Sequence, residues 1–129
     1  MGIIMPEDLA KAGSEEAHQS AVMCWCALNT QRLPMLKRVF HVPNGGLRSK
    51  ATASKMKAQG VKSGVPDIWF PYPMDNFHGL VIELKVDNKQ PFPAQLDWLT
   101  YLIEVGYSAI VCQGWESARD TILDYLHER

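Results

Sequence analysis

Residues 79–86 (GLVIELKV) constrain the fold of this chain more than any other segment. Side chains alternate between the two faces of a strand, so Val81, Glu83 and Lys85 share one face and the intervening apolar residues share the other. Burying a carboxylate and an ammonium on an otherwise apolar strand destabilises the fold, because both lose hydration, unless each charge finds a partner or a ligand. The segment therefore predicts a strand with a charged pair, which is either a functional site or a salt-bridged strand surface.

Asp67 begins a short extended segment that precedes this strand and ends at Pro71. If the two segments are neighbours in a sheet, Asp67 lies beside Glu83, and a divalent cation would relieve the repulsion between their carboxylates. Oxygen ligands favour Mg²⁺ or Mn²⁺ over Zn²⁺, and the Cys and His residues lack zinc-binding spacing. Lys85 would then orient a water molecule or neutralise charge that builds up on a phosphate.

Charge is distributed unevenly along the chain, although the formal net charge at pH 7 is only −1. No Asp or Glu occurs between Glu16 and Asp67. The basic residues of that stretch are Arg32, Lys37, Arg38, Arg48, Lys50, Lys55, Lys57 and Lys62. Such a stretch is either a solvated basic face or a surface that binds a nucleic-acid backbone.

Within the basic stretch, residues 44–46 (NGG) predict a turn. Their glycines either supply positive φ or let the backbone approach a phosphate, and we favour a turn with a nearby phosphate contact. The residues expected to contact DNA are Asn44, Arg48, Lys50, Lys55, Lys57 and Lys62. Because their pattern contains no code for reading bases, we expect recognition of DNA shape.

The 129 residues, 47% of them hydrophobic, predict one compact domain with a substantial core. We expect residues 1–13 to be a loose lead-in and residues 14–129 to form the domain. The pattern predicts helices at 15–30, 49–59, 94–105 and 115–127, and strands at 37–42, 67–70, 79–86 and 107–112. This order predicts an α/β domain with a mixed central sheet flanked by helices.

Two further expectations concern packing and location. The apolar positions Leu96, Leu99, Leu102 and Ile103 are expected on the inner face of their helix, and strand 107–112 is expected to be buried. No apolar run approaches the roughly 20 residues of a membrane span, and the N-terminal residues lack the features of a secretory signal. We therefore expect a reduced, cytoplasmic protein that does not bind membranes.

Short motifs in a fixed order carry a family resemblance. They are residues 42–48 (VPNGGLR), 60–67 (GVKSGVPD), 83–85 (ELK) and 93–95 (PAQ). Together they resemble the VRR-NUC family of the PD-(D/E)XK nuclease superfamily, in its compact stand-alone phage and bacterial form, over residues 14–126. The resemblance implies a restriction-endonuclease-like core, metal-dependent hydrolysis of DNA phosphodiesters, and a homodimer that acts on branched DNA such as four-way (Holliday) junctions.

The same resemblance implies roles for individual residues. Asp67 and Glu83 match the family's metal ligands, Lys85 its catalytic lysine, and the backbone carbonyl of Leu84 would complete the coordination. In this scheme Mg²⁺, or Mn²⁺ in its place, polarises the scissile phosphate and lowers the pKa of a bound water molecule. Hydrolysis would leave a 5′-phosphate and a 3′-hydroxyl.

Polar residues on two of the expected helices also match the family. A glutamate on the first helix, followed four residues later by glutamine, fits Glu15 with Gln19, and Glu16 is the alternative acid. Gln95 matches a glutamine on the helix after the ELK strand. It either contacts a phosphate or a water molecule at the site, or is an exposed polar residue at a helix start.

Other readings remain open at this level. Within the nuclease class, a flap endonuclease or nonspecific nickase is the alternative to a junction resolvase. A non-catalytic DNA-binding module of the same fold is the alternative from another class. For His41 a structural role is favoured over a catalytic one. An exposed aromatic among Phe77, Phe92 and Trp98 is a candidate dimer contact.

Overall fold

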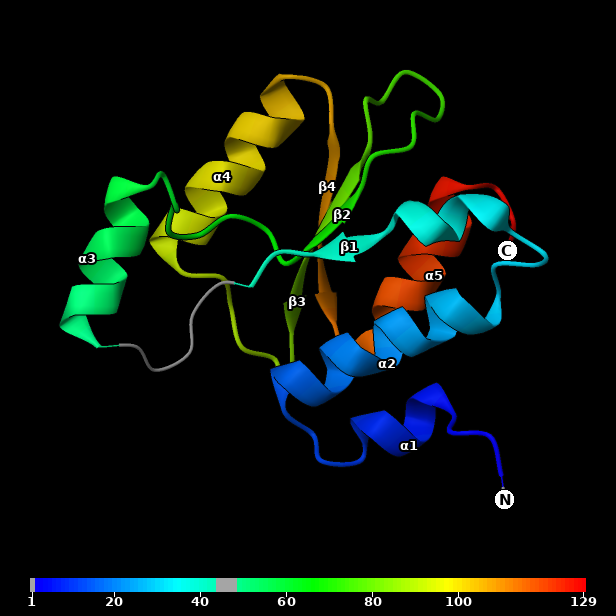
Figure 1. The fold of residues 1–129 in the computed structure, drawn as a ribbon. Helices are drawn as coiled ribbons and strands as arrows, with labels where there is room; N and C mark the ends of the chain where they lie inside the picture. The colour runs from blue at the N-terminus through cyan, green and yellow to red at the C-terminus, as the bar shows by residue number, and fades with distance from the viewer. Residues whose placement is uncertain (1, 44–48) are drawn as a thin grey trace.

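The computed structural model describes residues 2–43 and 49–129 (Figure 1). Its elements, in chain order, are α1 (Pro6–Ala10), α2 (Glu15–Leu28), η1 (Pro34–Arg38), β1 (Phe40–His41), α3 (Lys50–Ala58), β2 (Ile68–Phe70), β3 (Leu80–Lys85), α4 (Pro93–Glu104), β4 (Ser108–Gln113) and α5 (Trp115–Tyr125). The strands form one sheet in the order β1-β2-β3-β4, in which β2 is antiparallel to both neighbours and β4 is parallel to β3. The predicted α/β fold with a mixed central sheet is confirmed.

Helices cover both faces of the sheet. In Figure 1, α2 and α5 lie on one side and α4 on the other, while α3 lies beyond α4 at the margin of the molecule. No residue of α3 is buried. Within the described ranges, no helix has the length and apolar character needed to cross a bilayer.

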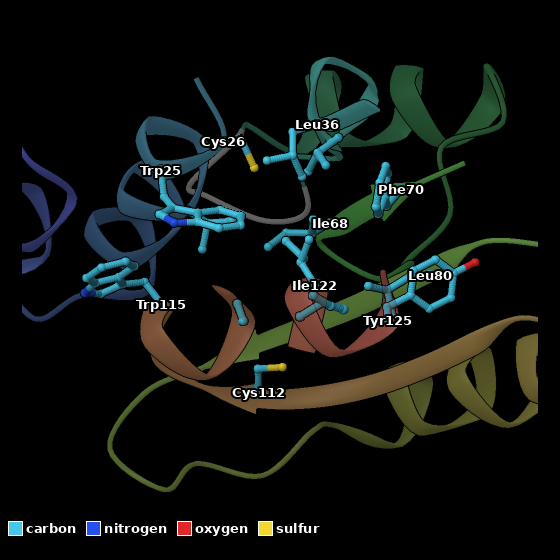
Figure 2. Close-up of a cluster of buried hydrophobic side chains, with 14 of the residues drawn as sticks. Trp25, Cys26, Leu36, Ile68, Phe70, Leu80, Cys112, Trp115, Ile122 and Tyr125 are labelled. Carbon is cyan, nitrogen blue, oxygen red and sulfur yellow. The ribbon is translucent and has the colours of Figure 1, made fainter. Parts of the chain in front are cut away.

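The main hydrophobic core fills the space between the sheet and helices α2 and α5 (Figure 2). Leu80, Ile82 and Leu84 of β3 lie in it with at most 1% of their surface exposed. They pack with other core side chains, among them Trp25, Ile68, Phe70, Cys112, Trp115 and Ile122. Burial of each large apolar side chain stabilises the fold by about 1.5–3 kcal/mol, so this core holds β3 firmly at the centre of the sheet.

The helix ends follow their local sequence signals. Ser14 Oγ accepts a hydrogen bond from the backbone N–H of Ala17 at 3.1 Å, and Ser49 caps α3 in the same way. After α3 and α4 the chain turns through Gly60 and Gly106, both with positive φ, which glycine adopts without steric cost.

The N-terminal segment is more ordered than predicted. We expected residues 1–13 to be a loose lead-in, but they include α1. Pro6 is buried, and Leu9 and Ala10 pack against the hydrophobic core. Apolar side chains at this spacing on a single turn were too few to register as a helical pattern, and their burial depends on contact with α2.

The predicted strand at 37–42 is wrong over most of its length. Residues Pro34–Arg38 form the 3₁₀ helix η1, and only Phe40–His41 pair with the sheet. Pro34 occupies the first helical turn, where its fixed φ is compatible with a helix. Leu36 then reaches the core, with 1% of its surface exposed, and this burial favours the turn over an extended strand.

Strand β4 is less buried than predicted. Cys112 is buried, whereas Ile110 and Val111 are 39% and 37% exposed. β4 lies at the edge of the sheet, so one of its sides has no neighbouring strand to cover it. A continuous apolar run does not distinguish an edge strand from a central one, which explains the error.

Helix α4 buries only part of its apolar stripe. Leu99 and Leu102 are buried as predicted. Leu96 and Ile103 are 50% and 57% exposed, contrary to prediction. The helix meets the sheet along a narrow strip, so apolar residues at the margins of its inner face remain in solvent.

Candidate active site

The second face of β3 carries charged side chains that are removed from solvent. Glu83 is 1% exposed and Lys85 is 3% exposed. An ordinary salt-bridged strand surface would leave both residues solvated, so the structure contradicts that alternative. Buried charges of this kind need partners or a ligand to offset their lost hydration.

Strand pairing brings the carboxylate of Asp67 to Glu83, as predicted. Ile68 pairs with Ile82, so the residue that precedes β2 lies beside Glu83. Asp67 Oδ2 also accepts a hydrogen bond from the backbone N–H of Leu84 at 2.8 Å. Burial raises the pKa of Glu83 to about 9, and the neighbouring Asp67 carboxylate adds to this shift through its negative charge and by accepting a hydrogen bond from protonated Glu83. Glu83 therefore holds its proton near neutral pH.

Lys85 lies between an acid and an aromatic ring. Its Nζ is 3.9 Å from Glu15 Oε1, at the first residue of α2, and 4.4 Å from the centre of the Phe92 ring. Glu16 is exposed and makes no contact with the lysine among the described ion pairs. The structure thus brings Glu15, the preferred of the two candidate acids, to β3.

The side chain of Gln95 is turned toward β3 and is not fully exposed at the helix start. Its Nε2 donates a hydrogen bond to Glu83 Oε2 at 3.3 Å, and its Oε1 accepts one from the backbone N–H of Phe92 at 2.8 Å. The second bond belongs to the N-terminal capping of α4 and orients the amide. Helix capping therefore fixes which end of Gln95 points at Glu83.

A cavity of about 300 Å³ opens beside these residues. Its lining residues are Glu15, Glu16, Gln19, Ser20, His41, Asp67 and Leu84. The ring Nδ1 of His41 donates a hydrogen bond to the backbone carbonyl of Asp67 at 2.9 Å, since a carbonyl oxygen can only accept. His41 is thus a partnered side chain that positions Asp67, in agreement with the structural role favoured for it.

Sequence reasoning passed over part of this cavity. The sequence motif indicates Gln19 only through its spacing from Glu15, and no motif includes Ser20. Both face the cavity because residues four apart lie on the same side of a helix, so Gln19 follows from Glu15 and Ser20 follows from Glu16. The four-residue spacing along the helix is therefore sufficient to predict Gln19 and Ser20 once Glu15 is placed at the site.

The donor set fits a hard divalent cation. Glu83 Oε1 and both amide atoms of Gln19 are buried without a hydrogen-bond partner. A cation between Asp67 and Glu83 would satisfy the unpaired oxygen and remove the repulsion between the carboxylates. Among residues 2–43 and 49–129, no three His, Cys, Asp or Glu side chains converge into a complete metal cluster. Further ligands would therefore come from the backbone or from a shift of Glu15.

The predicted DNA-contacting lysines lie together outside the core. Lys50, Lys55 and Lys57 are exposed on α3, and Lys62 is exposed just after it. Within the described part of the chain, none of them has an acidic partner in an ion pair. Asn44 and Arg48 lie outside the described residues.

Gly64 connects this basic segment to the site. It has φ +85°, and a Cβ atom added there would lie 2.6 Å from the backbone carbon and oxygen of Ala94, in the first turn of α4. The chain that follows α3 therefore lies in direct backbone contact with the turn that carries Gln95. Only glycine allows both the positive φ and this approach.

We expect Gly64→Ala to destabilise the protein by roughly 2 kcal/mol or more, because left-handed strain and displacement of Ala94 add together. Gly60→Ala is the matched control: Gly60 has φ +100° but nothing within 4 Å of an added Cβ. It should cost only the strain, about 1 kcal/mol. Urea unfolding of both variants measures the difference, and equal losses would contradict the proposed contact.

Two of the three cysteine thiols, those of Cys26 and Cys112, are buried. Burial raises the pKa of Cys26 to about 12 and also raises the pKa of Cys112. A thiol must ionise to act as a nucleophile, so neither residue is suited to covalent catalysis near neutral pH.

Comparisons with known proteins agree with this geometry. The model of the VRR-NUC domain family matches residues 6–116, a range that includes α1 and every candidate residue of the cavity and of β3. A solved structure described as a VRR_NUC domain protein superimposes with a TM-score of 0.74 at 31% sequence identity, covering 88% of this chain and 88% of that chain. No curated protein matches the sequence significantly.

Proposed function

This chain belongs to the VRR-NUC domain family, a nuclease-type domain, and from that premise we propose that it is a divalent-metal-dependent DNA endonuclease that resolves four-way junctions as a homodimer. One observation carries the proposal: the buried carboxyl of Glu83, with its raised pKa, lies beside the half-buried Asp67 on the strand pair that also presents the buried ammonium of Lys85. This arrangement is costly to the folded protein and suits the handling of a phosphate.

Asp67 and Glu83 would hold Mg²⁺ or Mn²⁺, with the Leu84 carbonyl and Glu15 as the proposed additional ligands. When bound, the cation supplies positive charge against the phosphate. Lys85 offsets the negative charge that develops as water replaces the 3′-oxygen at phosphorus, which leaves a 5′-phosphate and a 3′-hydroxyl.

Two side chains support this arrangement. The amide of Gln95 holds the Glu83 carboxyl in place, and the ring of His41 holds the Asp67 backbone. Because both groups are positioned by helix capping or by strand pairing, they are ordered before any substrate arrives.

Exposed apolar residues support a homodimer. Leu96, Tyr101 and Ile103 on α4 and Ile110 and Val111 on the edge strand β4 are each more than a third exposed. Apolar exposure on adjacent elements is typical of surfaces that associate. A two-fold dimer presents two active sites, as symmetric resolution of a junction requires. Sedimentation equilibrium measures the oligomeric state, and a monomer would contradict this part of the proposal.

The activity is tested with a four-way junction, a 5′ flap and a linear duplex, each in Mg²⁺, Mn²⁺ or EDTA. Paired, symmetric nicks on the junction alone, lost in EDTA, are the expected result. Cutting of the flap would favour a flap endonuclease, and cutting of every substrate would favour a nonspecific nickase. Binding without cleavage in either metal would favour a non-catalytic DNA-binding module.

The exposed lysines of α3 predict how binding depends on salt. Lys55→Glu with Lys57→Glu should weaken binding to every DNA about tenfold or more, and should lower the slope of log K against log salt by about 2. Lys11→Glu with Arg129→Glu is the matched control, with the same change of charge at exposed sites away from α3. Titrations at several salt concentrations measure the slope, and equal effects of both pairs would place the DNA elsewhere.

A further inference from the structure

Phe92 occupies a position that an aromatic residue fills poorly. It is the N-cap of α4, yet its side chain makes no capping hydrogen bond, and its surface is 66% exposed. Ser, Thr, Asp and Asn are preferred at N-caps because their oxygen accepts a hydrogen bond from the first turn. Phe92 therefore forgoes a cap and exposes a large apolar ring, and neither property helps the free protein to fold.

The ring is held against the catalytic strand. Lys85 Nζ lies over it, 4.4 Å from its centre, while the side chain of Lys85 is only 4% exposed. The backbone N–H of Phe92 donates to Gln95 Oε1, and Gln95 in turn donates to Glu83. One face of the ring thus lies toward the lysine, and much of the rest of the ring is exposed to solvent.

The position of the Phe92 ring beside Lys85 limits which part of a bound DNA it can contact. In the proposed nuclease, the scissile phosphate must come close to Lys85, so the sugar or base of an adjoining nucleotide passes beside Phe92. Aromatic side chains bind bases by stacking, without regard to sequence. In a continuous duplex every base is already stacked on both sides, so a base with a free face occurs only where the stack is interrupted.

We propose that Phe92 stacks on a base whose stacking is interrupted beside the scissile phosphate, and that this contact selects branched or otherwise discontinuous DNA. The inference rests on the proposed nuclease function and deepens it, because it names the feature of the substrate that the site recognises. The contact needs no base-specific hydrogen bonds, in keeping with a basic surface that reads DNA shape.

The test separates stacking from a structural role by replacing Phe92 with a better cap. Phe92→Ser should keep a melting temperature at or above that of the wild type, because serine caps the helix. Single-turnover cleavage of a four-way junction should nevertheless fall at least tenfold. Phe92→Leu, which keeps an apolar cover over Lys85 but cannot stack, should show the same loss, and Phe92→Trp should retain activity.

A second readout reports stacking directly. With 2-aminopurine placed beside the scissile phosphate of the junction and Ca²⁺ in place of Mg²⁺, the wild type should quench the fluorescence and Phe92→Ser should not. Leu28→Ser is the control, because Leu28 is a 46% exposed apolar residue at the end of α2, about 20 Å along that helix from Glu15. It should leave both cleavage and quenching at wild-type levels.

The outcomes distinguish this inference from the proposed function. If the wild type cleaves no DNA in Mg²⁺ or Mn²⁺, the proposed function fails and the inference fails with it. If the wild type cleaves the junction and Phe92→Ser or Phe92→Leu matches it, only the inference is overturned. Dissociation of a wild-type dimer by Phe92→Ser would assign the ring to a protein contact and would overturn stacking as well.

Discussion

Lys85→Ala is expected to abolish junction cleavage, with a fall of about 10²–10³-fold or more in the single-turnover rate, while junction affinity stays within about threefold. The ammonium is buried beside the carboxylates and cannot be replaced by solvent. In the proposed mechanism it contributes charge where charge develops during hydrolysis, whereas the proposed DNA contacts that set affinity are the exposed lysines of α3.

The fold should survive this substitution. Removal of the ammonium leaves Glu83 with a raised pKa, so Glu83 remains a neutral acid and no unpaired anion is created in the interior. Lys89→Ala is the control, because Lys89 is an exposed lysine in the loop that follows β3. Loss of binding together with a lowered melting temperature would instead make Lys85 a structural residue.

Glu83→Gln is expected to stabilise the metal-free protein while it eliminates cleavage. The pKa of Glu83 is raised from 4.5 to about 9 on folding. Between these values the folded state holds a proton that the unfolded state has released, so stability falls as pH rises through that window. Glutamine cannot ionise, so the variant should be more stable than the wild type at pH 8, by roughly 2 kcal/mol or more, and should lose this pH dependence.

Urea unfolding in EDTA from pH 5 to pH 9 measures this effect. Glu104→Gln, at an exposed glutamate of α4, is the control and should leave the pH dependence unchanged. Added Mg²⁺ should stabilise the wild type if the proposed site binds it only in the folded state, and should have little effect on Glu83→Gln. An unchanged slope in Glu83→Gln would show that Glu83 ionises freely in the folded protein.

Much of the candidate site follows from strand geometry. Alternation along residues 79–86 separated Glu83 and Lys85 from the core face, and the placement of Asp67 beside Glu83 needed only that β2 and β3 be neighbours. The role of Gln95 could not be settled in this way. An amide at a helix start faces either solvent or the sheet, depending on how the helix is rotated against its neighbours.

The wrong predictions of burial in β4 and α4 have the same cause as the open question about Gln95: the sequence does not show how each element is oriented in the fold. Ile110 in β4 and Ile103 in α4 are as apolar as the core residues beside them, yet both are exposed. The apolar character of a residue does not show whether its side chain lies in the core or at the margin of the sheet or helix. The same holds for Pro34–Arg38, where burial of Leu36 selected a 3₁₀ turn over the predicted strand.

The local sequence was sufficient wherever the physics is local. Three features depend only on neighbours a few residues away. They are the helix caps at Ser14 and Ser49, the glycines that end α3 and α4, and the alternation of the two faces of β3. The partners of the charged groups required the folded chain, because Glu15, Asp67 and Phe92 reach β3 from distant segments. Burial by those segments, which no local pattern encodes, is what turns an exposed-looking Glu-Leu-Lys strand into a desolvated site.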